Sequence, residues 1–131
     1  MTTQAKNNAV GWFEIPTANM DRAIAFYEAV FKVTLERNKI GDLEMAWFPW
    51  AEYGMGASGS LIHDPEHFKP STHGVIVYFT AHSGDLANEL SRVEAAGGKV
   101  IQPKTLITEE IGYFALIHDS EGNRIALHSR K

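Results

Sequence analysis

The sequence predicts an α+β fold in which one unit, a strand followed by a helix and three more strands, occurs twice. Two observations support this prediction. A strand-like segment followed by an amphipathic helical segment opens each half of the 131 residues. A self-comparison that places Gly11 on Gly74 also superposes the apolar helix stripes of the two halves. Each helix would cover one face of its sheet, so the two halves together would form an open trough or cup.

The first unit is expected over residues 9–64. Its helix, residues 18–33, has Asn19 or Asp21 as its cap and an apolar stripe that includes Tyr27 and Val30. Pro16 closes the strand before it. The expected strands are 9–17, 34–40, 43–50 and 60–64, with a hairpin turn at Gly41-Asp42.

The second unit is expected over residues 73–131, after a linker at residues 65–72 that contains two prolines. Its helix, residues 83–98, has Ser83 or Asp85 as its cap. The expected strands are 73–81, 99–103, 106–119 and 123–129, with a turn at Ser120-Glu121-Gly122. Residues 1–8 are polar, and we expect them to be disordered.

Composition narrows the classes of partner. A net charge of −4 and a pI near 5.8 argue against nucleic acid or an anionic membrane as a partner. The absence of cysteine excludes disulfides and thiolate metal sites. No stretch has the length of a membrane span, and the N-terminal residues lack the apolar run of a signal peptide. We therefore expect a cytoplasmic protein whose partner is a small molecule.

Three segments together carry a family resemblance: "DRAIAFYEAVF" (21–31), "VEAAGGKV" (93–100) and "DSEGNRIAL" (119–127). The chain resembles the vicinal oxygen chelate superfamily, the glyoxalase / bleomycin resistance protein / extradiol dioxygenase group, over residues 9–129. The opening "WFEIP" (12–16) is similar to a glyoxalase-like, lactoylglutathione-lyase-related subgroup. The resemblance implies two βαβββ modules that form a curved mixed sheet with an open cup, and commonly a homodimer.

Many members of this superfamily hold a divalent ion in the cup with four His, Gln or Glu ligands. The resemblance places these positions at Trp12, near Val75, at Ala126 and within residues 56–62. Tryptophan, valine and alanine side chains cannot ligate such an ion, and residues 56–62 contain no His, Gln, Glu or Asp. We therefore expect no metal and no other cofactor. A metal-dependent glyoxalase-type enzyme with atypical ligands stays open as an alternative.

Side chains alternate along a strand, so the residues that share a face with Trp12 should line the cup. The expected ligand-binding residues are Trp12, Glu14, Met45, Trp47, Val75, Val77, Phe79, Arg124, Ala126 and His128. Glu14 and His128 are the candidate catalytic residues. Alternatively, Glu14 pairs with Arg124 or with backbone amides and has a structural role. For Trp47, Trp50 and Tyr53, core packing is favoured over a role in a pocket wall or a subunit contact.

Two functions follow from this lining. The first is binding of a small organic molecule without a metal ion, because a mostly apolar cup with a few polar groups is typical of a ligand pocket. The second is a lyase or isomerase in which Glu14 acts as the base, with or without His128.

Two other motifs carry no prediction of function. "GMGASG" (54–59) lacks the strand and helix of a dinucleotide site, and "HDPEH" (63–67) reads as a solvated part of the linker.

Overall fold

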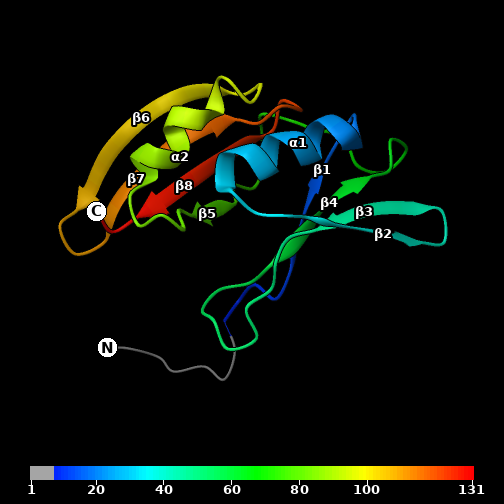
Figure 1. The fold of residues 1–131 in the computed structure, drawn as a ribbon, viewed down its shortest axis with the longest axis horizontal. Coiled ribbons are helices and arrows are strands. Elements are labelled where there is room, and N and C mark those ends of the chain that lie inside the picture. Colours follow the sequence, from blue (N-terminus) through cyan, green and yellow to red (C-terminus); the bar gives the residue numbers. More distant parts are fainter. Residues whose placement is uncertain (1–7) are drawn as a thin grey trace.

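A computed structural model describes residues 8–131 of the chain, so the expected disorder of residues 1–8 falls almost wholly outside the described residues. The order of strand, helix and three strands occurs twice, as predicted (Figure 1). The N-terminal module comprises β1 Phe13–Pro16, α1 Met20–Phe31, β2 Glu36–Ile40, β3 Leu43–Trp47 and β4 Gly59–His63. The C-terminal module comprises β5 Tyr78–Thr80, α2 Leu86–Val93, β6 Lys99–Thr108, β7 Gly112–His118 and β8 Arg124–Ser129.

Each module has one four-stranded mixed sheet, in the orders β1-β4-β3-β2 and β5-β8-β7-β6. The first strand of each module runs parallel to the last one, and the other pairs are antiparallel. The Thr17 amide donates to Ile62 O at 2.8 Å, and the Ala81 amide donates to His128 O at 2.9 Å. These matching bonds make Ala81 the counterpart of Thr17. The repeat is therefore shifted by one residue from the self-comparison, which had placed Thr80 there.

This shift makes one predicted cup residue wrong. Phe79 lies on the helix side of β5, with ring centroids 4.8 Å from Phe31 and 5.5 Å from Phe13. Tyr78 takes the opposite face, beside its strand partner Ala126. The physical reason is the two-residue period of a strand, because a slip of one residue exchanges the two faces.

The predicted strand 73–81 is shortened to β5. Gly74 adopts φ +105°, outside the strand region, and its carbonyl accepts a hydrogen bond from Arg124 Nη2 at 3.0 Å. The segment before β5 is thereby turned away from a regular ladder. In the same module β6 continues to Thr108, so the predicted strand 99–103 is too short and the one after it begins too early.

Both helices begin at a capped residue. Asn19 accepts a hydrogen bond from the Arg22 amide, and Asp85 accepts one from the Ala87 amide, so these two residues are the caps among the predicted alternatives. α2 ends at Val93, before the predicted end at the Gly97-Gly98 pair. No helix of the described residues has the length and apolar character that a membrane crossing requires.

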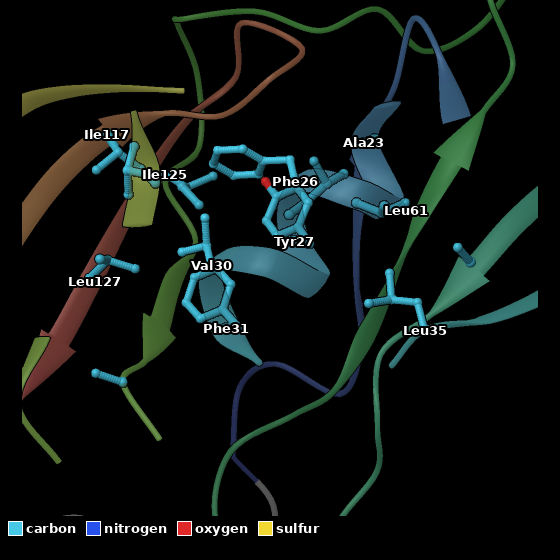
Figure 2. Close-up of a cluster of buried hydrophobic side chains, with 14 of the residues drawn as sticks. Ala23, Phe26, Tyr27, Val30, Phe31, Leu35, Leu61, Ile117, Ile125 and Leu127 are labelled. Atoms are coloured by element: carbon cyan, nitrogen blue, oxygen red, sulfur yellow. The ribbon is translucent and has the colours of Figure 1, made fainter. Parts of the chain in front are cut away.

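The hydrophobic core is shared by the two modules and is organised around α1 (Figure 2). Phe26, Tyr27 and Val30 are fully buried in this helix. They pack in one cluster with residues of both sheets, among them Leu61, Ile117, Ile125 and Leu127. An amphipathic helix with a broad apolar face serves both sheets here, so the chain forms one folding unit.

The turn between β7 and β8, residues 119–123, links the modules by side-chain hydrogen bonds. Glu121 accepts bonds from the amides of Ala18 and Asn19 at 2.8 and 2.7 Å and from Arg22 Nε at 2.7 Å. Asn123 Nδ2 donates to the Pro16 carbonyl at 2.8 Å. We call residues 119–123 the module-joining turn.

Charge and burial oppose each other within this turn. Burial raises the pKa of Glu121, but the hydrogen bonds from Arg22, the backbone amides and Ser120 outweigh it, so the pKa lies below its ordinary value. The buried Tyr27 hydroxyl donates to Asp119 Oδ2 at 2.6 Å. Burial, followed by the charge of Asp119, raises the pKa of Tyr27 well above its usual value. Both groups are thus held in the protonation states that their hydrogen bonds require.

Candidate functional site

The face of each sheet opposite the helices, called here the open face, carries most of the predicted site residues. On the N-terminal sheet, Glu14, Ser60 and Trp47 are successive cross-strand partners on β1, β4 and β3. Ile15 and Leu61, their chain neighbours, are buried in the core on the helix side. A carboxylate, a hydroxyl and an indole therefore form one row across three strands.

A cluster of three indoles, the tryptophan cluster, lies at the Trp47 end of this row. The ring centroid of Trp12 lies 6.0 Å from that of Trp47, edge to face, and 6.3 Å from that of Trp50. Trp50 is 70% exposed and belongs to the β3–β4 loop, residues 48–58, which also exposes Tyr53 and Met55. The expectation of core packing is therefore wrong for Trp50 and Tyr53.

Two polar atoms of the row are buried without a hydrogen-bond partner in the described part of the chain: Trp47 Nε1 and Ser60 Oγ. Ser60 as a whole has no exposed surface. Buried polar groups are almost always paired, and an unpaired one costs about 1–3 kcal/mol. Both atoms lie at or beside the tryptophan cluster and are covered there, so an acceptor from outside the chain would reach them only after a neighbouring ring has moved.

At the Glu14 end of the row lies a pocket of about 140 Å³, called here the Glu14–Arg124 pocket. It is formed by β1, the start of β8 and the irregular segment 69–77. Its charged and titratable lining residues are Glu14, Lys69, His73 and Arg124. Arg124 Nη2 donates to Gly74 O at 3.0 Å, whereas Arg124 Nε is buried without a partner in the described residues.

Glu14 is exposed and has no hydrogen bond or ion pair with any side chain or amide of residues 8–131. The ion pair with Arg124 that the sequence suggested is thus absent from the described structure, although both residues line the same pocket. Glu14 and Arg124, which carry opposite charges, line one pocket without forming an ion pair with each other. Such an arrangement suits a ligand with complementary charges.

The structure divides the predicted site residues into groups. Trp12 and Trp47 belong to the tryptophan cluster. Met45 is buried on β3 and lines a separate hollow with Arg37, Asn38, Lys39 and Glu44. Glu14, Val75, Val77 and Arg124 line the pocket. Ala126 and His128 lie on the open face of β8, outside the pocket lining, and Phe79 is half-buried and packs against the core.

His128, the second candidate catalytic residue, is held by the β6–β7 turn. Its Nε2 atom lies 2.7 Å from the Ile111 carbonyl, and the residue is not part of the lining of the Glu14–Arg124 pocket. The described geometry therefore does not bring Glu14 and His128 together as an acid–base pair.

Sequence reasoning missed Ser60, Lys69 and His73 as site residues. Ser60 can be recognised as a site residue only from its strand pairing with Glu14 and Trp47, and this pairing cannot be derived from the sequence. Lys69 and His73 belong to or adjoin the predicted linker, and the pocket arises because this segment folds back against β1 and β8. The signal available in the sequence was weak: Lys69 and His73 flank the short polar stretch 70–72, just before Gly74.

The residues present do not fit the divalent ion that the resemblance implies. In the repeat register of the structure, the four metal-ligand positions of the superfamily correspond to Trp12, Ser60, Ile76 and Ala126. Of these four side chains, only that of the serine has an oxygen atom. No group of three or more His, Cys, Asp or Glu side chains is gathered for a metal within residues 8–131. In the "HDPEH" segment, His67 Nδ1 pairs with Asp64 at 2.9 Å while His63 Nδ1 lies 2.9 Å from the Thr17 carbonyl.

Comparison with known proteins identifies the family. Residues 9–127 match the model of the Glyoxalase/Bleomycin resistance protein/Dioxygenase superfamily, and the chain belongs to this family. No curated protein matches the chain. The family and fold predictions are thus confirmed.

Three solved structures illustrate the likeness in fold. A glyoxalase-related enzyme from Fulvimarina pelagi has a TM-score of 0.69 at 13% identity, covering 94% of this chain and 88% of its own. TnmS3, an antibiotic binding protein from Streptomyces sp. CB03234, has a TM-score of 0.63 at 19% identity, covering 98% and 100%. An E144Q mutant of glyoxalase I from Zea mays has a TM-score of 0.67 at 17% identity, covering 92% of this chain but only 46% of its own. This chain thus spans about half of the maize protein.

Proposed function

We propose that the protein binds a small, flat organic molecule on the open face of its N-terminal sheet, without a metal ion. The observation that carries this proposal is the pair of buried, unpartnered donors, Trp47 Nε1 and Ser60 Oγ, beside the tryptophan cluster. An acceptor on the ligand would remove the cost of both unpaired groups. The rings of Trp12 and Trp50 would contact the apolar faces of the ligand.

Access to these donors requires a local rearrangement, because both atoms are covered in the structure. Trp50 is the group that can move, since its side chain is mostly exposed and lies in a loop. An outward turn of its ring would open the tryptophan cluster and leave Trp12 and Trp47 as walls. Support from relatives comes from TnmS3, an antibiotic binding protein with the same fold at low identity.

The test compares two flat bicyclic probes of similar size. Coumarin carries a lactone with two acceptor oxygens, and naphthalene carries none. We expect coumarin to quench tryptophan fluorescence and to bind at least about tenfold more tightly than naphthalene, because each made hydrogen bond is worth about 1 kcal/mol. Ser60→Ala should weaken coumarin binding and leave naphthalene binding unaffected. Trp47→Phe, which also makes one wall of the site smaller, should weaken coumarin binding more than naphthalene binding.

Ser58→Ala is the matched control, because the Ser58 hydroxyl donates to the Pro49 carbonyl at 2.8 Å and has an internal partner. It should leave coumarin affinity unchanged. Equal binding of both probes, or no loss in Trp47→Phe and Ser60→Ala, would refute the assignment of these donors. If the purified protein contained a stoichiometric metal ion, and if removing that ion abolished coumarin binding, the proposal that binding needs no metal would be refuted.

We propose binding rather than catalysis because Glu14 lacks a second proton-active group within hydrogen-bond distance in the described residues. A base that moves a proton next to a carbonyl needs an acid or an electrophilic group to stabilise the resulting charge. His73 lines the same pocket, but its Nδ1 atom is 3.0 Å from the Thr72 hydroxyl. The alternative of a lyase or isomerase would regain support if a bound ligand brought Glu14 and His73 to the same carbon.

We also propose a cytoplasmic homodimer. The lack of cysteine suits a reducing compartment. Besides Trp50, the β3–β4 loop exposes two large apolar side chains, Tyr53 and Met55, and such groups gather at subunit contacts. Sedimentation equilibrium at micromolar concentration should give twice the chain mass of 14.6 kDa, and a monomer would contradict this.

A further inference from the structure

We infer that the Glu14–Arg124 pocket binds a zwitterionic head group, a carboxylate together with an ammonium, on the ligand whose flat part occupies the tryptophan cluster. The inference rests on the proposed function and adds the chemical class of the ligand. Its basis is the pair of opposite, unneutralised charges that line one small pocket.

Arg124 is the group for the carboxylate. Its guanidinium is anchored on one side, since Nη2 donates to the Gly74 carbonyl, while Nε is buried and has no partner in the described structure. Because Nε is covered in the structure, the guanidinium must first turn toward the pocket; a carboxylate there would form a charge-assisted bond with Nε and take the second Nη2 hydrogen. Guanidinium is preferred at such sites because its planar donors match the two carboxylate oxygens.

The rest of the pocket favours an anion next to Arg124. Lys69 adds a second positive charge, and the Ser71 hydroxyl adds a possible donor. Asn123 also lines the pocket, but its side-chain amide already donates to the Pro16 carbonyl and to Asp119 Oδ2 at 3.0 Å. The carboxylate is therefore assigned to Arg124 and Lys69, not to the module-joining turn.

Glu14 is the group for the ammonium. Glu14 lines the same pocket from β1, and its carboxylate has no partner in residues 8–131. The pocket is lined by one acidic residue, Glu14, and by two basic residues, Lys69 and Arg124. A ligand with only a negative charge would be attracted by the basic residues but repelled by Glu14. A ligand that carries both signs satisfies both ends, and this selects a zwitterion over a simple acid.

Size and position agree with a head group. The pocket volume of about 140 Å³ lies below the roughly 300–1,000 Å³ of sites that enclose a whole drug-sized molecule. Glu14 is the strand partner of Ser60, which in turn is the partner of Trp47. The pocket and the tryptophan cluster are therefore the two ends of one row, and one ligand can reach both.

The experiment uses four naphthyl probes that share one ring. Naphthylalanine carries the ammonium and the carboxylate, naphthylpropionate only the carboxylate, naphthylpropylamine only the ammonium, and ethylnaphthalene neither. Calorimetry at pH 7 and low salt should rank naphthylalanine first, about tenfold or more tighter than ethylnaphthalene, since each opposite charge gains a charged hydrogen bond. Naphthylpropionate should bind more weakly than naphthylalanine because Glu14 repels it.

Two variants separate the two charges. Arg124→Lys, which keeps the charge but removes Nε and the planar geometry, should weaken naphthylalanine and naphthylpropionate about tenfold and leave naphthylpropylamine unchanged. Glu14→Gln should weaken naphthylalanine and naphthylpropylamine and improve naphthylpropionate. Glu110→Gln, in the exposed β6–β7 turn, is the control and should change none of the affinities. Arg124→Lys is preferred over Arg124→Ala because it keeps a cation for the Gly74 carbonyl.

The outcomes distinguish this inference from the proposed function. If coumarin binds as expected but naphthylalanine gains nothing over ethylnaphthalene, the head-group assignment is wrong and the binding function stands. If naphthylalanine gains affinity but Arg124→Lys and Glu14→Gln do not change it, the pocket is the wrong site. If neither coumarin nor any naphthyl probe binds, the proposed function and this inference fail together.

Discussion

The two modules share one topology but differ in how their polar groups are used. In the C-terminal module, buried Asp119, Asn123 and Glu89 are all hydrogen-bonded, and the first two belong to the module-joining turn. In the N-terminal module, the buried hydroxyl of Ser60 and the indole nitrogen of Trp47 have no partner in the described chain. In the C-terminal module only Arg124 Nε, at the start of β8, is buried without a partner among residues 8–131. Polar groups that stabilise a fold are usually paired, and the unpaired ones are the groups on which the proposed ligand site is built.

The helices differ in the same way. α1 buries six residues and contributes to a core shared by both sheets, whereas α2 buries three and packs mainly on its own sheet. The C-terminal module in return supplies the turn that caps the start of α1. One copy of the repeat thus provides the central helix and the tryptophan cluster, and the other provides the turn that supports this helix and one wall of the Glu14–Arg124 pocket.

The largest expected effect comes from breaking the contact between the modules at Phe79. Phe79→Ala should lower the free energy of unfolding by about 3–4 kcal/mol, because four aromatic rings from the N-terminal module lie against this one. Urea unfolding measures the change. The neighbouring Tyr78 is 56% exposed on the other face, so Tyr78→Ala should cost less than about 1 kcal/mol. If Phe79→Ala and Tyr78→Ala lowered the free energy of unfolding equally, the placement of Phe79 on the helix side of β5 would be contradicted.

The next effect concerns the module-joining turn. Glu121→Gln should lower the free energy of unfolding at pH 7 by about 2 kcal/mol, since the amide replaces a charged acceptor of several hydrogen bonds. The pKa of Glu121 is lower in the folded protein than its ordinary value of 4.5, so its contribution is complete above that value. It is lost as the pH falls through the depressed pKa.

Urea unfolding from pH 7 to pH 2.5 tests this dependence. The difference between the original protein and Glu121→Gln should shrink once the pH drops below 4.5. Glu109→Gln, in the exposed turn between β6 and β7, serves as the control with a difference near zero throughout. A difference that stays constant with pH would show that the charge of Glu121 does not act through the turn.

The smallest effect sharpens the comparison of unpaired and paired hydroxyls. Ser60→Ala should raise the free energy of unfolding by about 1 kcal/mol, because it removes a buried hydroxyl without a partner. Ser58→Ala should lower it by about 1 kcal/mol, because Ser58 donates to the Pro49 carbonyl. Thermal unfolding of both variants measures the two opposite shifts. A loss of stability in Ser60→Ala would mean that its hydroxyl has a structural role.

Element order was predictable from the sequence because the local signals are strong. Asn19 and Asp85 begin their helices as capping residues do, and Gly41-Asp42 joins β2 to β3 as a two-residue turn. Alternation also placed Glu14, Trp47 and Arg124 on the open faces correctly. These features depend on residues within a few positions of one another, which a single sequence contains.

The remaining features depend on register and on distant contacts. Phe79 was misplaced because the two halves share few identities, so a shift of one residue could not be detected. Ser60 gains its significance from Trp47 and Glu14, which belong to other strands. The part played by Glu121 at the start of α1 joins residues about a hundred positions apart. Local pattern carries no information on such pairings.

The placement of α1 has a consequence for the making of the protein on the ribosome. Phe26 lies against Gly98, and the Tyr27 hydroxyl reaches Asp119, both of which are translated long after the helix itself. A nascent chain that ends before β8 therefore contains all of α1, but the apolar face of this helix that packs on the C-terminal sheet is still exposed to solvent. The N-terminal half can complete its packing only after the C-terminal half has left the exit tunnel, and until then its exposed apolar surface favours aggregation.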